Sequence, residues 1–220
     1  MPQRRVILRR VALIVGGLAA WFTTQALIAG RGFPEGSIGD GLFNLTAPVN
    51  DWLMNHPGAA DGLLIVSSAL IDLVGVFLLL RAIFGPTIRP FLGLLILFAL
   101  RQVCQAVCAL PAPEGMIWRH PGWPSLLVTY ATANDFFFSG HTAIAVFGAT
   151  ELARLPGRGW KWLGAALALF EMSVVIILRA HYTMDVFAGA AAALAVAFIV
   201  ARLAPPVDRG LGGATSGGTN

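Results

Sequence analysis

Long apolar runs separated by short polar stretches make up most of this chain. Six runs have roughly the 17–25 residues that a helix needs to cross a bilayer, and they cover residues 9–30, 61–83, 88–110, 136–154, 161–179 and 183–203. Prolines at or near several run ends, where proline stops a helix, mark boundaries: Pro86, Pro111, Pro156 and Pro205. The pattern predicts an all-α, polytopic membrane protein built as a bundle of six transmembrane helices.

The whole pattern fits a single domain over residues 1–210, followed by a tail. Between the first two runs, apolar residues recur at nearly helical spacing: Leu42, Phe43, Leu45, Val49, Trp52 and Leu53. This indicates a short amphipathic helix that either lies on the membrane surface or packs against the bundle. Residues 211–220 are rich in Gly, Ser and Thr, and we expect them to be disordered.

Composition supports the membrane assignment. Of the 220 residues, 57% are hydrophobic and 12% are charged, whereas a soluble domain usually carries about 25% charged residues. The net charge of +4 does not indicate a nucleic-acid partner, because the basic residues lie at the ends of apolar runs and form no single patch. Cys104 and Cys108 lie inside an apolar run without further ligands nearby, so we interpret them as core thiols.

The distribution of Lys and Arg predicts the orientation. With the N-terminus inside, the inner side holds Arg4, Arg5, Arg9, Arg10, Arg81, Arg89, Arg154, Arg158, Lys161, Arg202 and Arg209. The outer side holds only Arg31, Arg119 and Arg179. The bias predicts cytoplasmic termini. The first run is longer than a signal-peptide core of roughly 7–15 residues, so we expect it to be a retained span.

Two polar islands interrupt the apolar pattern, and both fall on the predicted outer side. The first covers residues 135–142 and the second covers residues 179–185. Ionisable groups in an apolar setting are costly and tend to be functional. The islands are one membrane hairpin apart, so we expect them to meet in the folded protein.

The second island places His181 and Asp185 four residues apart, on one face if a helix has begun there. Asp185 can then hold the imidazole in one tautomer, which leaves the other ring nitrogen free to attack phosphorus. The alternative is an interfacial histidine beside an acidic helix cap.

The first island supplies a complementary set of groups. Ser139, Gly140 and His141 open the fourth run, and a helix N-terminus with small residues offers N–H groups to an anion. His141 is suited to protonate a leaving oxygen and then to serve as a base. Together the islands predict a phosphoryl-transfer site. A metal site formed by His141, His181 and Asp185 is an alternative, because the ligand types are suitable.

These motifs resemble those of the type 2 phosphatidic acid phosphatase superfamily, and more closely its sphingomyelin synthase and lipid phosphotransferase branch. Residues 134–142 read Asn-Asp-Phe-Phe-Phe-Ser-Gly-His-Thr, and residues 181–185 read His-Tyr-Thr-Met-Asp. Arg101 followed by Leu-Pro-Ala-Pro at residues 110–113 is also similar to that branch. With Glu114 and Gly115, the latter segment is similar to plant cholinephosphotransferases that exchange headgroups with diacylglycerol.

The resemblance implies a six-helix membrane enzyme that uses a phosphohistidine intermediate and neither metal nor cofactor. It implies His181 as the nucleophile, Asp185 as its orienting group, and His141 as acid and base. Asp135 matches the aspartate of the family motif, which implies a substrate-binding residue. The arginines of the phosphatase pattern have no counterpart, since Arg89-Pro90 falls on the inner side and residues 175 and 176 are Val and Ile.

We therefore expect other arginines to bind phosphate. Arg101 and Arg179 are the candidates, beside Ser139 and Gly140. The alternatives are a structural pair with a carboxylate for Arg101 and snorkelling to headgroups for Arg179. Asp72 and Glu171 are interpreted as structural.

The predicted function is transfer of a phosphorylated headgroup from a phospholipid to a lipid alcohol, diacylglycerol or ceramide, on the outer (periplasmic or lumenal) face. One alternative is a lipid phosphate or pyrophosphate phosphatase with water as acceptor. Another is a membrane scaffold or transporter without catalysis. The expected partners are the two lipids, with no nucleic acid and with a homo-oligomer left open.

Overall fold

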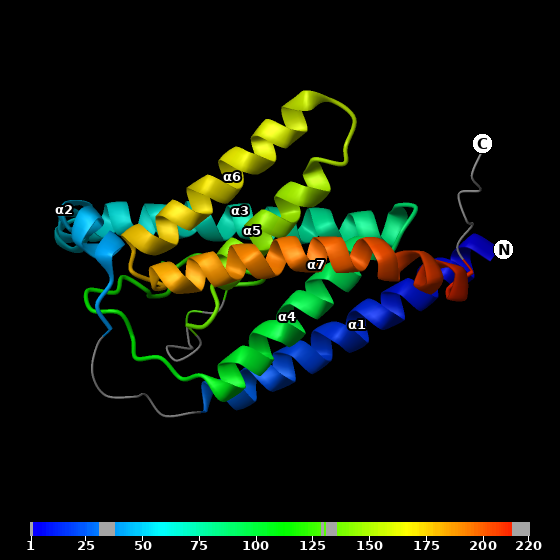
Figure 1. Ribbon diagram of the computed structural model, residues 1–220, viewed down its shortest axis with the longest axis horizontal. Helices are drawn as coiled ribbons and strands as arrows, with labels where there is room; N and C mark the ends of the chain where they lie inside the picture. The colour runs from blue at the N-terminus through cyan, green and yellow to red at the C-terminus, as the bar shows by residue number, and fades with distance from the viewer. Residues whose placement is uncertain (1, 31–37, 129, 131–135, 213–220) are drawn as a thin grey trace.

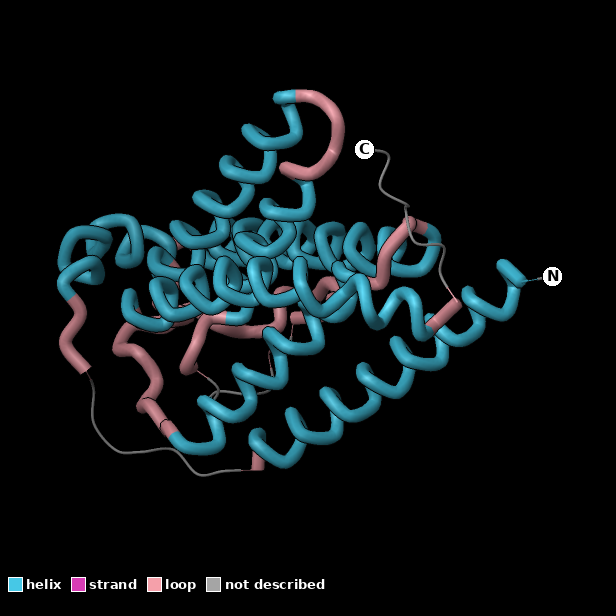
Figure 2. The backbone as a smooth tube through the Cα atoms, turned by 45° about the vertical axis from the view of Figure 1, so that its right-hand side comes forward, coloured by secondary structure: helices cyan, strands magenta, loops and turns pink. Residues whose placement is uncertain are grey.

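The computed structural model describes residues 2–30, 38–128, 130 and 136–212, and within these the regular secondary structure is entirely helical (Figures 1 and 2). The described residues form α1 (Pro2–Ala29), α2 (Gly41–Asn55), α3 (Pro57–Phe84), α4 (Arg89–Val107), α5 (Gly140–Leu152), α6 (Arg158–Ile177) and α7 (Thr183–Gly210). The all-α prediction is confirmed for this part of the chain. Asp135, most of the predicted tail and the segment between α1 and Ile38 lie outside the described residues.

In the described part of the chain, five helices are long and apolar enough to cross a membrane: α1, α3, α4, α6 and α7. A sixth membrane-spanning helix over residues 136–154 is not confirmed. α5 has 13 residues, which gives a length of about 20 Å against a hydrocarbon core of about 30 Å. The three phenylalanines raise the hydropathy of the run, but the helix begins only at Gly140.

α5 lies inside the bundle. It packs against α3, α4, α6 and α7, and residues from its start to its end are buried. Phe147 of α5 sits over Gly93 of α4, where an added Cβ would collide with its ring. The short helix is therefore covered by its neighbours, and its first residues lie inside the bundle.

The amphipathic segment forms the helix α2, with one face on the protein and one face outward. Phe43 and Leu53 are buried, whereas Leu45 and Trp52 are 75% and 51% exposed. α2 contacts α3 and α6, so the packing interpretation holds for the buried face. The exposed apolar face fits a helix at a membrane surface.

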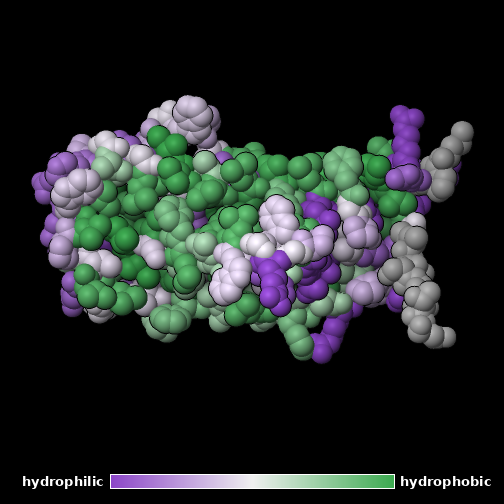
Figure 3. All heavy atoms as spheres, turned by 90° about the horizontal axis from the view of Figure 1, so that it is seen from above, coloured by the Kyte–Doolittle hydropathy of each residue, from purple (hydrophilic) through white to green (hydrophobic). Residues whose placement is uncertain are grey.

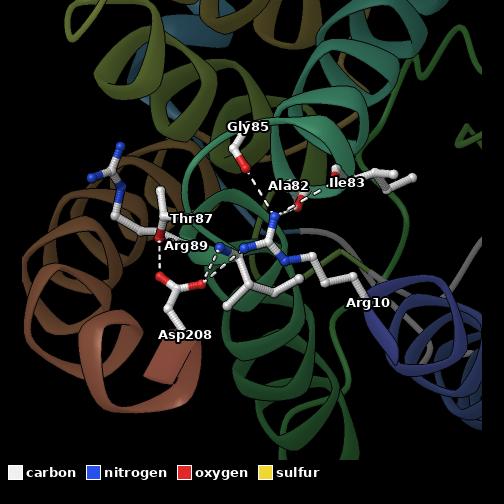
Figure 4. A network of polar contacts seen from close by, with 8 residues as sticks. Arg10, Ala82, Ile83, Gly85, Thr87, Arg89 and Asp208 are labelled. Carbon is white, nitrogen blue, oxygen red and sulfur yellow. Dashed lines mark hydrogen bonds and ion pairs between the residues drawn. The ribbon is translucent and has the colours of Figure 1, made fainter. Parts of the chain in front are cut away.

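Polar contacts close one end of the bundle (Figure 4). The Arg10 guanidinium donates to the Gly85 carbonyl at 2.8 Å and lies 3.5 Å from the Asp208 carboxylate, which also accepts from the Thr87 hydroxyl at 2.6 Å. Arg89 forms two hydrogen bonds with Glu151 at the end of α5. This end therefore joins the start of α1, the α3–α4 connection and the ends of α5 and α7.

Figure 3 shows hydrophobic residues over most of one face, with hydrophilic residues gathered mainly at the two ends and in one patch between them. Together with the five apolar helices, this surface fits an integral membrane protein. Cys104 and Cys108 are unpaired and half-buried in and after α4, which agrees with their interpretation as core thiols.

Candidate active site

The two polar islands meet in one cavity at the end of the bundle opposite Arg10 and Asp208. Its space, including the open mouth, is about 570 Å³. Helices α1, α3, α4 and α5 and the segments before α5 and α7 contribute to its wall. The lining residues are Trp21, Gln25, Ile71, Phe98, Arg101, Trp118, Leu127, Val128, Phe136, Gly140, His141, Ile144, Ala180 and His181.

His181 is buried just before α7, and its ring is held by the backbone of the first island. Its Nδ1 lies 2.8 Å from the Phe136 carbonyl oxygen. A carbonyl only accepts hydrogen bonds, so Nδ1 carries the proton and donates it. In the neutral ring, Nε2 then carries the lone pair. This is the tautomer that a nucleophilic Nε2 needs.

Asp185 lies close to His181 but does not provide this hydrogen bond. Its Oδ2 is 3.8 Å from the His181 Nδ1 and accepts a 2.9 Å hydrogen bond from the Tyr182 backbone N–H. The carboxylate thus caps the first turn of α7, where the helix dipole favours a negative charge. The sequence assigned tautomer control to Asp185, whereas the structure gives the short hydrogen bond to Phe136 and leaves Asp185 as a nearby negative charge.

The starts of α5 and α7 are fastened to each other. The Ser139 N–H donates to the Asp185 carbonyl at 3.1 Å, and the Ser139 hydroxyl caps α5 by accepting from the Thr142 N–H at 3.3 Å. Gly189 of α7 permits this approach, because an added Cβ would stand 2.7 Å from the Ser139 carbonyl oxygen. Ser139 therefore positions the site from behind, while Gly140 and His141 line the cavity.

His141 occupies the first turn of α5, with its ring edge against Trp118 at a centroid distance of 5.4 Å. Its Nε2 is buried and has no hydrogen-bond partner among the described residues. Burial, together with the smaller electrostatic influence of His181 and Arg101, lowers the pKa of His141 to about 3. The imidazole is therefore neutral at pH 7.

Arg101 brings a buried positive charge to the same cavity. Its Nε donates to the Phe138 carbonyl at 2.7 Å, and the guanidinium stands beside Gly140, where an added Cβ would be 3.4 Å from Nε. The two carboxylates interpreted from the sequence as structural form contacts elsewhere. Asp72 accepts from the Leu126 and Leu127 N–H groups, and Glu171 accepts from the Ser67 hydroxyl.

Arg179 is not brought into the cavity. Its Nη1 donates to the Glu114 carbonyl at 2.8 Å, and its guanidinium lies 5.3 Å from the centre of the Phe43 ring. The residue therefore joins the segment after α4 to α2. Asp135, the remaining predicted binding residue, lies outside the described residues. Within the described residues, no three His, Cys, Asp or Glu side chains are grouped closely enough to hold a metal ion.

Sequence reasoning missed several contributors to the site. No motif singled out Trp118, which forms part of the cavity wall beside His141. Gln25 and Trp21 reach the cavity from α1. A glutamine within an apolar run was a usable signal, because a polar amide there needs partners. No local pattern marked the Phe136 carbonyl.

Comparison with known families settles the relationship that the motifs raised. The family model AtPDCT1/2 matches residues 39–202, which is more than half of the chain. The protein belongs to the AtPDCT1/2 family. The name denotes phosphatidylcholine:diacylglycerol cholinephosphotransferases, which are lipid phosphotransferases.

This match corrects the resemblance to the type 2 phosphatidic acid phosphatase superfamily and its sphingomyelin synthase branch, which was wrong. The shared Ser-Gly-His-Thr and His-Tyr-Thr-x-Asp patterns are short. Motifs of this length do not distinguish one family of lipid phosphotransferases from another. No curated protein and no solved structure matches the chain. The match begins after α1, so the α1 contribution to the cavity lies outside the matched region.

Proposed function

We propose that the protein moves phosphocholine from a phosphatidylcholine to a diacylglycerol within the membrane. The observation that carries the proposal is the meeting of His141, His181 and Arg101 in one cavity, in a chain of the AtPDCT1/2 family. The cavity wall also contains apolar side chains such as Phe98 and Ile144. An apolar wall limits water, which favours a lipid alcohol over water as the acceptor.

In the first half of the reaction, the lone pair on the His181 Nε2 attacks the phosphorus of the donor. The bond from phosphorus to the glycerol oxygen breaks, and that oxygen takes a proton from His141. The products are a diacylglycerol and a phosphocholine group on Nε2. The protonated His181 ring that results remains beside the Asp185 carboxylate, whose negative charge opposes the new positive charge.

In the second half, the neutral His141 removes the proton from the hydroxyl of the acceptor diacylglycerol. The deprotonated oxygen of the acceptor attacks phosphorus with its lone pair. The bond from phosphorus to Nε2 breaks, and its electron pair returns to His181. His141 is protonated again and the histidine is free. No electron is gained or lost overall, so the exchange needs no further reactant.

Arg101 has two tasks in this scheme. It stabilises the negative charge on the phosphoryl oxygens as phosphorus changes partners. It also links binding to protonation, because an anionic phosphodiester beside Arg101 offsets the positive charge that lowers the pKa of His141. Donor binding thus raises the pKa of His141 and shifts the residue toward its acid form.

We place this chemistry on the outer face of the membrane. The support is the excess of Lys and Arg on the opposite side, together with the location of the cavity at the end of the bundle away from Arg10 and Arg89.

A vesicle assay tests the proposed reaction. Purified protein is reconstituted with phosphatidylcholine labelled in the choline phosphate and with an unlabelled diacylglycerol of different chain length. Label is expected in the phosphatidylcholine that carries the new chains, and not in water-soluble phosphocholine. Ceramide replaces diacylglycerol in a parallel arm. Release of label mainly to water contradicts transfer, and transfer to ceramide alone contradicts the assigned acceptor.

A further inference from the structure

A second cavity lies between α1, α3 and α4, next to the candidate active site. Its lining is apolar throughout, and its space including the open mouth is about 410 Å³. Three side chains belong to the walls of both cavities: Trp21, Phe98 and Leu127. The apolar cavity therefore shares a wall with the one that holds the histidines.

Two glycines lie in the wall of this cavity. Gly17 of α1 faces α4, where an added Cβ would be 2.8 Å from the Phe91 Cζ and 3.3 Å from the Leu95 Cδ1. Gly75 of α3 accepts the Leu127 side chain, which a Cβ would collide with. Gly16, the residue before Gly17, has no neighbour within 4 Å of an added Cβ. The two adjacent glycines thus differ sharply in what surrounds them.

The boundary between the cavities is firmly held. The Trp21 ring stacks on Phe98 at a centroid distance of 4.2 Å, and the Trp21 carbonyl accepts from the Gln102 Nε2 at 3.0 Å. The Asp72 carboxylate holds the Leu126 and Leu127 N–H groups at 2.8 Å each. The side chains at the boundary are therefore fixed from α1, α4 and α3.

We propose that the apolar cavity holds an acyl chain of the lipid whose phosphorylated headgroup occupies the active site, and that Gly17 sets the room for that chain. This rests on the proposed function only in naming the headgroup site. Lipid tails in the bilayer are already in apolar surroundings, so burial of a chain here adds little affinity. The benefit is orientation, because a chain held beside Trp21 restricts where the phosphorus lies relative to His181.

Photolabelling tests this inference without requiring turnover. The full protein is reconstituted in phosphatidylcholine vesicles that contain a trace of phosphatidylcholine with a diazirine near the end of one acyl chain. A second arm uses diacylglycerol with the same chain, which distinguishes a donor chain from an acceptor chain. After illumination, mass spectrometry locates the labelled residues on α4. Leu94, which is 6% exposed and lines the cavity, reports occupancy, and the outward Val103 reports ordinary bilayer contact.

Gly17→Val and Gly16→Val are the matched variants. Gly17→Val should lower labelling at Leu94 at least fivefold, whereas Gly16→Val should leave it unchanged, and Val103 should be labelled equally in all three proteins. Leu95→Phe, which fills the same cavity from α4, should act like Gly17→Val and replaces it if that variant fails to fold.

Absence of label at Leu94 in the unaltered protein overturns the inference, and so does equal labelling in the cavity-filling variants. Protein that is labelled at Leu94 but moves no headgroup retains this inference while the proposed function fails. Headgroup transfer without label at Leu94 supports the proposed function and overturns this inference.

Discussion

Replacing Asp185 with asparagine separates the two tasks of its carboxylate. An asparagine oxygen can still accept the hydrogen bond from the Tyr182 N–H, which measures 2.9 Å, so α7 should keep its first turn. The negative charge 3.8 Å from the His181 Nδ1 is removed. The Nδ1 hydrogen bond to the Phe136 carbonyl stays, so His181 should keep its tautomer.

The expected size of the effect follows from this distance. Two unit charges about 4 Å apart interact by about 4 kcal/mol at an effective dielectric constant of about 20. The positive charge on His181 exists only after attack on phosphorus. Removing the negative charge of Asp185 therefore raises the barrier by about that amount. The rate of headgroup transfer should therefore fall about a thousandfold. Loss of tautomer control costs about ten-thousandfold in a catalytic triad.

Initial rates of headgroup transfer in vesicles, measured together with Tm, test this reasoning. Asp185→Asn should keep Tm, whereas Asp185→Ala also loses the helix cap, about 1 kcal/mol, and should lower Tm by about 2–4 °C. Both variants should lose the same factor in rate. An Asp185→Asn rate within a few-fold of the unaltered protein refutes the charge argument. A loss as complete as that of His181→Ala, at unchanged Tm, refutes tautomer control by Phe136.

Four further predictions follow from the site and its supports. His181→Ala should abolish transfer and any acid-labile phosphoryl adduct seen after a quench, whereas His141→Ala should still form adduct with a donor whose leaving group needs little protonation; adduct on His141 alone would reverse the two roles. Transfer should persist in EDTA, and loss that one divalent ion restores would instead support a metal site. Asp40 accepts from the Leu42 N–H and from both Thr183 donors. Burial raises the pKa of Asp40, but these hydrogen bonds together outweigh burial and hold the pKa below its ordinary value of 3.8. The contribution of Asp40 to stability is therefore present above the unfolded-state pKa and is lost as the pH falls through the folded-state pKa. Asp40→Asn should accordingly lower Tm at pH 6, and the difference from the unaltered protein should shrink as the pH falls through the folded-state pKa of Asp40. The exposed Asp51→Asn control should leave Tm unchanged at every pH. A Tm difference for Asp40→Asn that does not depend on pH contradicts this. A single cysteine at position 158 should react with an impermeant reagent only from the cytoplasmic side, and labelling from outside would invert the topology.

The sequence by itself determined the features that depend on local pattern. Apolar runs of sufficient length identified five membrane helices, because the bilayer imposes that length whatever the neighbours are. Helical spacing of apolar residues identified α2, and polar residues in apolar surroundings identified His141, His181 and Arg101, which share a cavity. Each of these inferences uses residues close together in the chain.

The tertiary structure alone decided what depends on distant residues. Hydropathy could not show that α5 starts at Gly140, because phenylalanines in an extended segment count the same as phenylalanines in a helix. The Phe136 carbonyl reaches His181 across 45 residues, and a backbone carbonyl has no signature in a sequence. The Glu114 carbonyl likewise draws Arg179 away from the cavity across 65 residues. The close contact of Gly17 in α1 with Phe91 and Leu95 in α4 is a property of two packed helices and of neither one alone.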